Sequence, residues 1–172
     1  MSGQSSDPGT RVTLVPDLRP LRDTDVADVL ALNEANVEML SAMDEAELRY
    51  LQGLIDRFDV VDVDGAFGGF VVTMTSGTDY DSAYYGWFEK NFDRFYYLDR
   101  IVLHPDFRRR GYGGLVYDEI ERVAAPYGRL CLEVNLAPRN DASLAFHRGR
   151  GFVEVGQFGD EAHLVSLMEK RL

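Results

Sequence analysis

Cysteine is nearly absent from this 172-residue sequence, which contains only Cys131. One cysteine cannot form a disulfide within the chain, so a secreted disulfide scaffold is excluded and a reducing compartment is expected. No apolar run approaches the roughly 18–20 residues of a membrane span, and Met1–Thr10 has neither the charged nor the apolar region of a signal peptide. We therefore expect a cytoplasmic protein with no membrane partner.

Lysine and histidine are also scarce, and this excludes several kinds of site. The two lysines, Lys90 and Lys170, lie far from any glycine-rich loop, so a Walker A nucleotide site is excluded. The three histidines, His104, His147 and His163, are scattered and none has ligand spacing to a cysteine or carboxylate. We therefore expect no metal site. The sequence has no Gly-x-Ser-x-Gly elbow, which leaves a serine hydrolase unsupported.

Acidic residues outnumber basic ones by 29 to 18, a formal net charge of −11 that argues against nucleic-acid binding. The first 103 residues contain 8 basic and 19 acidic side chains, whereas the rest contain 10 of each. Two basic clusters occur in this balanced part, Arg108–Arg110 and the set Arg139, Arg148 and Arg150. The charge pattern fits either a solvated acidic surface or a molecule with one side for an anion and another for a cation.

The length and the periodicity predict one α/β domain over residues 11–172, preceded by a disordered tail at residues 1–10. Asp64-Gly65 is a strong hairpin signal between two alternating runs. The aromatic-rich segment 76–93 reads as an irregular insertion with a short helix near 82–91. The expected strands are 14–22, 59–63, 66–75, 95–103, 130–135, 152–158 and 164–169, and the expected helices are 23–40, 44–58, 111–127 and 140–150. This order predicts a mixed sheet of six to seven strands, flanked by about four helices, with one parallel pair.

The most informative stretch is Leu98–Leu115, in which an apolar strand leads through three arginines to Gly111-Tyr112-Gly113-Gly114 at a helix start. Glycines let the backbone approach a ligand closely. The first helical turn also offers unpaired amides and partial positive charge, which suit a phosphate. A dinucleotide fingerprint would need a third glycine where Val116 stands, so that alternative is weak.

The pattern Arg108-x-x-Gly111-x-Gly113 resembles the signature of the GNAT superfamily of acyl-CoA N-acyltransferases. A second stretch agrees with the family's later motif: Asn140 opens a helix, and Gly151-Phe152 follows a few positions after it. The two motifs occur in the family's order and cover about Leu98–Phe152. The resemblance implies a GNAT-like fold in which the central parallel strands splay apart.

The resemblance also implies acetyl-CoA as co-substrate, without a metal. Its pyrophosphate would rest on the glycine-rich turn, and its pantetheine arm would pair with the backbone of the central strand, in the gap between the splayed strands. Arg108 and Arg148 are candidate phosphate partners, with a solvated role as the alternative for each, and Asn140 and Ser143 match positions that contact the cofactor arm. The expected cofactor-binding residues are Ile101, Val102, Leu103, Arg108, Arg109, Arg110, Gly111, Tyr112, Gly113, Gly114, Asn140, Ser143 and His147.

Acetyl transfer to an amine requires a base, because an ammonium of pKa about 10 has no lone pair. Glu133 is the first candidate, since it shares a strand face with Cys131 and Asn135 and opposes the apolar neighbours. Its Leu-Glu-Val setting also resembles that of the catalytic Glu in ribosomal-protein alanine N-acetyltransferases. Asp99, acting through a water chain, is the alternative base.

The acid position departs from the family's pattern, because His147 stands where a tyrosine is usual, four residues before the Gly-Phe pair. His147 is a candidate for donating a proton to the leaving thiolate. It could equally only hydrogen-bond the cofactor sulfur, or the thiolate could leave without help. Tyr97 and Tyr112 are alternative acids without a spacing argument.

The predicted function is therefore N-acetyl transfer from acetyl-CoA to a primary amine, by direct attack in a ternary complex. The acidic first part of the chain favours a cationic acceptor, either a small molecule or a protein amine. A non-catalytic acyl-CoA-binding module and a protein-interaction domain are the alternatives. The family analogy also suggests a homodimer, and the insertion 76–93 would either cover the substrate or form a subunit contact.

Overall fold

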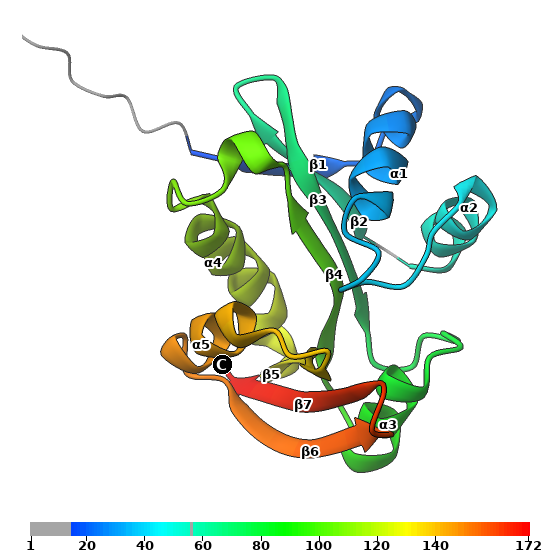
Figure 1. Cartoon of the computed structure of the whole chain (residues 1–172), viewed down its shortest axis with the longest axis vertical. Helices are drawn as coiled ribbons and strands as arrows, with labels where there is room; N and C mark the ends of the chain where they lie inside the picture. The colour runs from blue at the N-terminus through cyan, green and yellow to red at the C-terminus, as the bar shows by residue number, and fades with distance from the viewer. Residues whose placement is uncertain (1–14, 56) are drawn as a thin grey trace, which may run out of the picture.

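Seven strands form one mixed sheet in the computed structural model, which describes residues 15–55 and 57–172. The order across the sheet is β1-β2-β3-β4-β5-β7-β6 (Figure 1). The strands are β1 (Asp17–Pro20), β2 (Arg57–Val63), β3 (Ala66–Thr75), β4 (Tyr96–Leu103), β5 (Arg129–Ala137), β6 (Val153–Gly159) and β7 (Leu164–Arg171). The tail expected at residues 1–10 lies outside the described residues.

In the part of the chain that the structure describes, five α-helices cover the two faces of the sheet, which confirms the mixed α/β prediction (Figure 1). They are α1 (Val26–Glu34), α2 (Glu45–Leu54), α3 (Ala83–Asn91), α4 (Tyr112–Ala124) and α5 (Asp141–Gly149), with short 3₁₀ turns at Asp23–Asp25, Pro105–Phe107 and Ala125–Tyr127. Buried side chains of α1, α2 and α3 form one apolar core with the sheet, and those of α4 and α5 form a second. None of the helices in the described residues is both long and apolar enough to cross a membrane.

Local sequence signals account for most element boundaries. Asp44, Ser82 and Asn140 each accept a hydrogen bond from the backbone amide three residues on, and thereby cap α2, α3 and α5. Asp64 and Gly65 both have positive φ, 55° and 82°, as the tight turn between β2 and β3 requires. The predicted hairpin and the short helix in the insertion are therefore confirmed.

The first predicted helix is wrong at its end, because α1 ends at Glu34 rather than near Leu40. Residues 36–40 continue instead as turns with backbone bonds between residues three apart. Two asparagines explain the change: the Asn36 side chain donates to the Leu32 carbonyl at 2.8 Å, and the buried Asn33 donates to the Ser41 carbonyl at 3.1 Å. Such side-chain bonds to the backbone compete with helix continuation.

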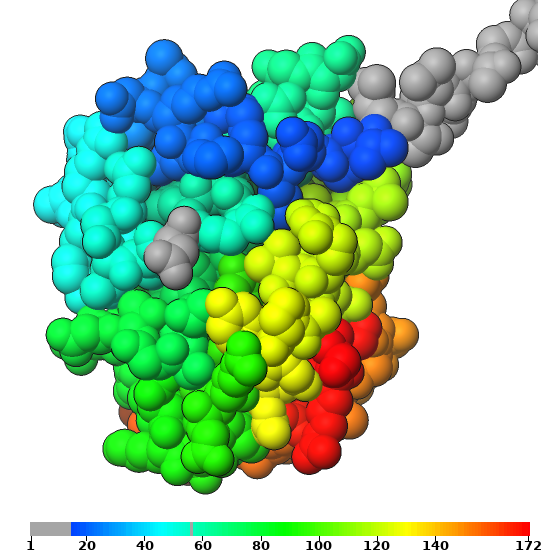
Figure 2. All heavy atoms as spheres, turned by 180° about the vertical axis from the view of Figure 1, so that it is seen from behind, coloured from blue at the N-terminus to red at the C-terminus, as the bar shows by residue number. Residues whose placement is uncertain are grey.

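The parallel pair β4–β5 is paired only at its start, where Tyr96 faces Leu130 and Tyr97 faces Cys131. Beyond these residues β4 continues along β3 as far as Leu103, and β5 continues along β7. The two central strands therefore diverge, as the resemblance implied. On the opposite face of the molecule, the turn after α4 lies beside the last residues of β7 (Figure 2), where Leu172 donates its amide to the Gly128 carbonyl at 3.2 Å.

Candidate functional site

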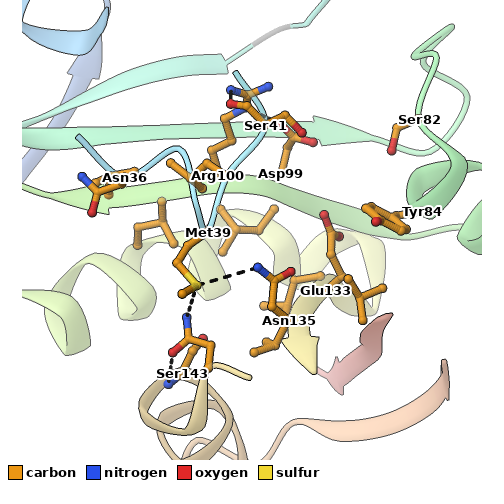
Figure 3. Close-up of a pocket in the computed structure, with 18 of the residues that line it drawn as sticks. Asn36, Met39, Ser41, Ser82, Tyr84, Asp99, Arg100, Glu133, Asn135 and Ser143 are labelled. Atoms are coloured by element: carbon orange, nitrogen blue, oxygen red, sulfur yellow. Dashed lines mark hydrogen bonds and ion pairs between the residues drawn. The ribbon is translucent and has the colours of Figure 1, made fainter. Parts of the chain in front are cut away.

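A cavity of about 1110 Å³ opens where β4 and β5 diverge (Figure 3). Residues 98–103 of β4 form one wall and residues 132–135 of β5 form the opposite wall. Parts of the loop 36–42, the segment 80–84 and the first turns of α5 also contribute to the lining. We call this space the central cavity. It brings together side chains from both halves of the chain.

The backbone of β4 faces the central cavity at Ile101, Val102 and Leu103, the residues expected to hold the cofactor arm. These residues pair with β3 on one side and have no ladder partner in β5 on the other. Backbone amides and carbonyls that lack a ladder partner favour a ligand able to hydrogen-bond them. This wall is therefore suited to an extended, amide-rich ligand.

The glycine-rich turn lies at the N-terminus of α4. Gly111 is the N-cap residue with φ 84°, and Arg109 has φ 58°, a backbone conformation that is uncommon outside glycine. The amides of Tyr112, Gly113 and Gly114 form the first turn of the helix, where no intrahelical acceptor is available. Their free amides and the helix dipole make this turn suited to an anion.

The arginines of the two basic clusters differ in their surroundings. Arg108 lines the central cavity, donates to the Leu103 carbonyl at 2.8 Å and donates to the Asn36 side chain at 3.1 Å. Arg109 and Arg110 are exposed and make no ion pair with other described residues. Arg150, by contrast, contacts Asp118 at 2.8 Å and is not free to meet a ligand. The second cluster is therefore partly neutralised, since Arg139 also pairs with Asp141.

Glu133 projects from β5 into the central cavity (Figure 3). It is half-buried, and the Tyr97 hydroxyl donates a 2.5 Å hydrogen bond to its Oε2 atom. Burial, together with the negative charge of Asp99, raises the pKa of Glu133 to about 8, against the lowering effect of the Tyr97 hydrogen bond. Glu133 is therefore a carboxyl group that changes its protonation state near neutral pH.

Asp99 and Arg100, consecutive on β4, form a buried ion pair of 3.1 Å. Asp99 Oδ1 accepts a hydrogen bond from the Tyr80 hydroxyl at 2.9 Å, while Oδ2 accepts one from Arg100 Nε. Burial raises the pKa of Asp99 although Arg100 opposes that shift. Both carboxylate oxygens of this alternative base therefore accept side-chain hydrogen bonds, whereas in Glu133 only Oε2 accepts one from the residues that the structure describes.

His147 lies on α5, is buried and lines the central cavity. Its Nδ1 atom is 2.7 Å from the Ser143 carbonyl oxygen, which has no proton, so Nδ1 carries one. Burial lowers the pKa of His147, so the ring is neutral near pH 7 and Nε2 accepts the 2.6 Å hydrogen bond from the Tyr117 hydroxyl. Both ring nitrogens of His147 therefore have protein partners.

Tyr117, on α4, also lines the central cavity and was missed by sequence reasoning, which considered Tyr97 and Tyr112. Tyr97 instead bonds Glu133, and Tyr112 is buried in the core beneath α4. The signal for Tyr117 was its place in the apolar stripe of α4, because a buried tyrosine hydroxyl needs a polar partner. The sequence alone does not identify His147 as that partner.

Asn140 and Ser143, the residues predicted to contact the cofactor arm, both line the central cavity. The Asn140 side chain accepts a hydrogen bond from the Ser143 amide at 3.1 Å. The side-chain amides of Asn135 and Asn140 also donate to the sulfur of Met39 at 3.8 Å each (Figure 3). Met39 belongs to the loop after α1, so this loop reaches across the cavity to β5 and α5.

The structure therefore brings Asp99, Glu133 and His147 to one cavity with the expected residues of β4 and α5, whereas residues 109–114 lie outside its lining. Within residues 15–55 and 57–172, no three histidine, cysteine, aspartate or glutamate side chains are grouped so that they could hold a metal ion. Cys131 is fully buried, and burial raises the pKa of its thiol, as expected for a small core residue.

Comparison with known proteins agrees with this geometry. The model of the acetyltransferase (GNAT) family matches residues 35–152, which is more than half of the chain. No curated protein matches the chain in sequence.

Solved structures resemble the whole fold. Ard1 from Thermoplasma volcanium superposes with a TM-score of 0.70 at 17% identity, over 92% of this chain and 99% of that one. Spermidine N-acetyltransferase from Vibrio cholerae, in complex with CoA and spermine, gives 0.68 at 18% identity, over 91% and 95%. The ribosomal-protein-S18-alanine N-acetyltransferase from Escherichia coli gives 0.61 at 17% identity, over 91% and 93%.

Proposed function

Because this chain belongs to the GNAT acetyltransferase family, we propose that it transfers an acetyl group from acetyl-CoA to a primary amine held in the central cavity. The observation that carries this proposal is Glu133, whose pKa of about 8 suits a general base at neutral pH. The Glu133 side chain lines the gap between β4 and β5, whose divergence leaves room for both substrates. Direct transfer within a ternary complex needs no residue of the protein to be acetylated.

The residues present fit coenzyme A. We assign its pyrophosphate to the amides of residues 109–114, with Arg109 and Arg110 exposed beside them. Its pantetheine arm is assigned to the backbone of Ile101–Leu103, with Asn140 and Ser143 at the opposite wall. When bound, acetyl-CoA supplies the acyl thioester. The backbone amides of β4 would polarise the thioester carbonyl, which is the role of an oxyanion hole.

In the proposed reaction Glu133 removes a proton from the ammonium group of the acceptor. The neutral amine nitrogen then forms a bond to the acetyl carbon and loses a second proton to solvent as the amide forms. The carbon–sulfur bond breaks, and the thiolate of CoA departs. We assign the proton that the thiolate receives to the Tyr117 hydroxyl, which turns from His147 Nε2 toward the sulfur and afterwards regains a proton from solvent. His147 positions that hydroxyl, because its neutral Nε2 atom accepts the bond at 2.6 Å.

We propose a cationic acceptor, in keeping with the acidic first part of the chain. Glu38, Glu47 and Asp81 line the cavity together with Glu133, whereas the charge of the buried Arg100 is matched by Asp99. Relatives of similar fold are described by their names as acting on spermidine and on a protein alanine. A small polyamine and a protein N-terminus are therefore the first acceptors to test.

A panel of amines assayed by release of free CoA thiol tests the function directly. Thiol release that requires both acetyl-CoA and one cationic amine supports the proposal. Binding of acetyl-CoA without thiol release for any amine would favour the alternative, a non-catalytic acyl-CoA-binding module. Absence of acetyl-CoA binding by calorimetry would contradict both.

The pH dependence of the rate separates Glu133 from Asp99 as the base. A base acts when deprotonated, so the rate rises with pH through the Glu133 pKa of about 8. The variant Asp99→Asn removes a negative charge that raises this pKa, so the rise moves to lower pH. Tyr97→Phe removes a hydrogen bond that lowers the pKa, so the rise moves to higher pH. Disappearance of the rise in Asp99→Asn would instead make Asp99 the base.

Replacement of Tyr117 by Phe tests the assignment of the leaving-group proton. We expect kcat to fall about tenfold or more, because general acids contribute at least that much when a proton is needed. The KM for acetyl-CoA should change little. Tyr127→Phe is the control, since Tyr127 lies in the turn after α4, outside the cavity lining. A kcat equal to that of the unaltered protein would mean that the thiolate leaves without help.

A further inference from the structure

We infer that Asp99 and Arg100 act together as a positioning unit that fixes two further segments of the central cavity, which border its acceptor side. We call these segments the acceptor walls, to distinguish them from the walls formed by β4 and β5. The first wall is the loop 35–43 between α1 and α2, and the second is the segment 76–82 that precedes α3. The inference rests on the proposed function only where it refers to the acceptor. The connection between the walls stands on the contacts themselves.

Arg100 holds the first wall. Its side chain is 4% exposed, and Nη1 donates to the Ser41 carbonyl at 2.9 Å and to the Asn33 side-chain oxygen at 3.1 Å. The Asn33 side chain in turn donates to the same Ser41 carbonyl at 3.1 Å. The end of the loop is therefore attached both to β4 and to α1.

Asp99 holds the second wall. The hydroxyl of Tyr80 donates to Asp99 Oδ1 at 2.9 Å. The start of the segment is held from α3, because the amides of Gly77 and Thr78 donate to the Glu89 carboxylate and the Tyr85 hydroxyl. Two backbone bonds surround Tyr80 itself: its amide donates to the Thr78 carbonyl at 2.8 Å, and Ser82 donates to the Tyr80 carbonyl at 2.9 Å. The bond to Asp99 therefore connects this local turn to the central strand.

The ion pair between the two residues joins the walls. The side chains of Asp99 and Arg100 are 8% and 4% exposed, so each charge would be costly to leave unmatched. Loss of the Tyr80 bond removes one of the two contacts that fix the Asp99 side chain, so the ion pair, and with it the loop 35–43 held by Arg100, loses a positional restraint. Segments about 40 residues apart in the chain thus depend on one dipeptide.

This arrangement explains why Asp99 is ill-suited as the base and gives it another role. The two walls and Glu133 surround the same space, so their positions determine where an acceptor amine lies relative to the Glu133 carboxylate (Figure 3). Acetyl-CoA is assigned to the opposite end, at residues 101–103 and the glycine-rich turn. Loosening the acceptor walls should therefore weaken binding of the acceptor much more than that of acetyl-CoA, whose expected binding residues hydrogen-bond the described part of the loop only through Asn36 and Met39.

Tyr80→Phe is the kinetic test, because it removes one hydroxyl and leaves the buried ion pair in place. We expect the KM for the acceptor to rise about tenfold, as for loss of a hydrogen bond to a charged group. The KM for acetyl-CoA should stay within about twofold, as should both constants in the control Tyr127→Phe. An unchanged acceptor KM, or an equal rise in both KM values, would overturn the inference.

A double variant shows whether Tyr80 acts through Asp99 or by touching the acceptor. If it acts through Asp99, Tyr80→Phe adds no further rise in the acceptor KM to the variant Asp99→Asn. Full additivity of the two effects would mean that Tyr80 contacts the acceptor directly, and the positioning role would be wrong.

Amide hydrogen exchange tests the connection without any enzymatic activity. In Tyr80→Phe we expect faster exchange in residues 76–82 and also in residues 35–43, which Tyr80 does not hydrogen-bond. Faster exchange confined to 76–82 would overturn the inference. This measurement needs no acceptor amine, so it tests the link between the two segments even if no amine is acetylated. Failure of the inference is therefore distinguishable from failure of the proposed function.

Discussion

Replacement of Glu133 by Gln is expected to lower kcat by about 100-fold to 10,000-fold, the usual contribution of a general base. The amide has nearly the same shape and still accepts the Tyr97 hydrogen bond at one oxygen. It cannot take a proton from the acceptor ammonium. The rise of the rate with pH near the Glu133 pKa of about 8 should disappear with the lost activity. Steady-state rates between pH 6 and 10 measure both effects.

The control for this variant is Glu119→Gln. Glu119 lies on α4, pairs with Arg122 at 2.6 Å and is not part of the cavity lining. Its replacement removes the same charge and should leave kcat and the pH profile unaltered. If Glu133→Gln keeps a normal pH profile, the proton is taken by Asp99 or by solvent, and the proposed role of Glu133 fails.

Replacement of Gly113 by Glu should abolish measurable binding of CoA, with affinity reduced by at least about 100-fold. A carboxylate in the first turn of α4 would meet the pyrophosphate assigned there, and opposing like charges cost several kcal/mol, equivalent to more than two decades of affinity. The protein itself tolerates the position, because a Cβ atom at Gly113 meets only the Leu103 side chain at 3.7 Å. Calorimetric titration with CoA measures the loss.

A control variant with a glutamate elsewhere separates the local repulsion of the pyrophosphate from the effect of one added negative charge on the whole protein. At Gly53, on α2, an added Cβ has no neighbour within 4 Å, so Gly53→Glu introduces the same charge without a clash. CoA affinity should be unchanged in this control, and circular dichroism should show both variants folded. Normal affinity in Gly113→Glu would contradict the assignment of the pyrophosphate to residues 109–114.

Much of the fold was predictable because its signals are local. The capping residues Asp44 and Asn140 and the Asp64-Gly65 turn determine backbone geometry within a few positions. Alternation along β5 likewise indicated that Glu133 shares a face with Cys131. The helix after Val26 was predicted too long because an apolar stripe does not reveal that asparagine side chains bond the backbone and end the helix.

Thus the sequence by itself determined the order of strands and helices, the glycine-rich turn at the start of α4, and the strand face on which Glu133 lies. Only the tertiary structure decided which side chains meet in the central cavity. Tyr97 bonds Glu133 across 36 positions, Tyr117 bonds His147 across 30, and Arg100 bonds Ser41 across 59. The physical reason is that periodicity assigns a residue to a face of its own element, whereas its partner depends on how the elements pack and where β4 and β5 diverge.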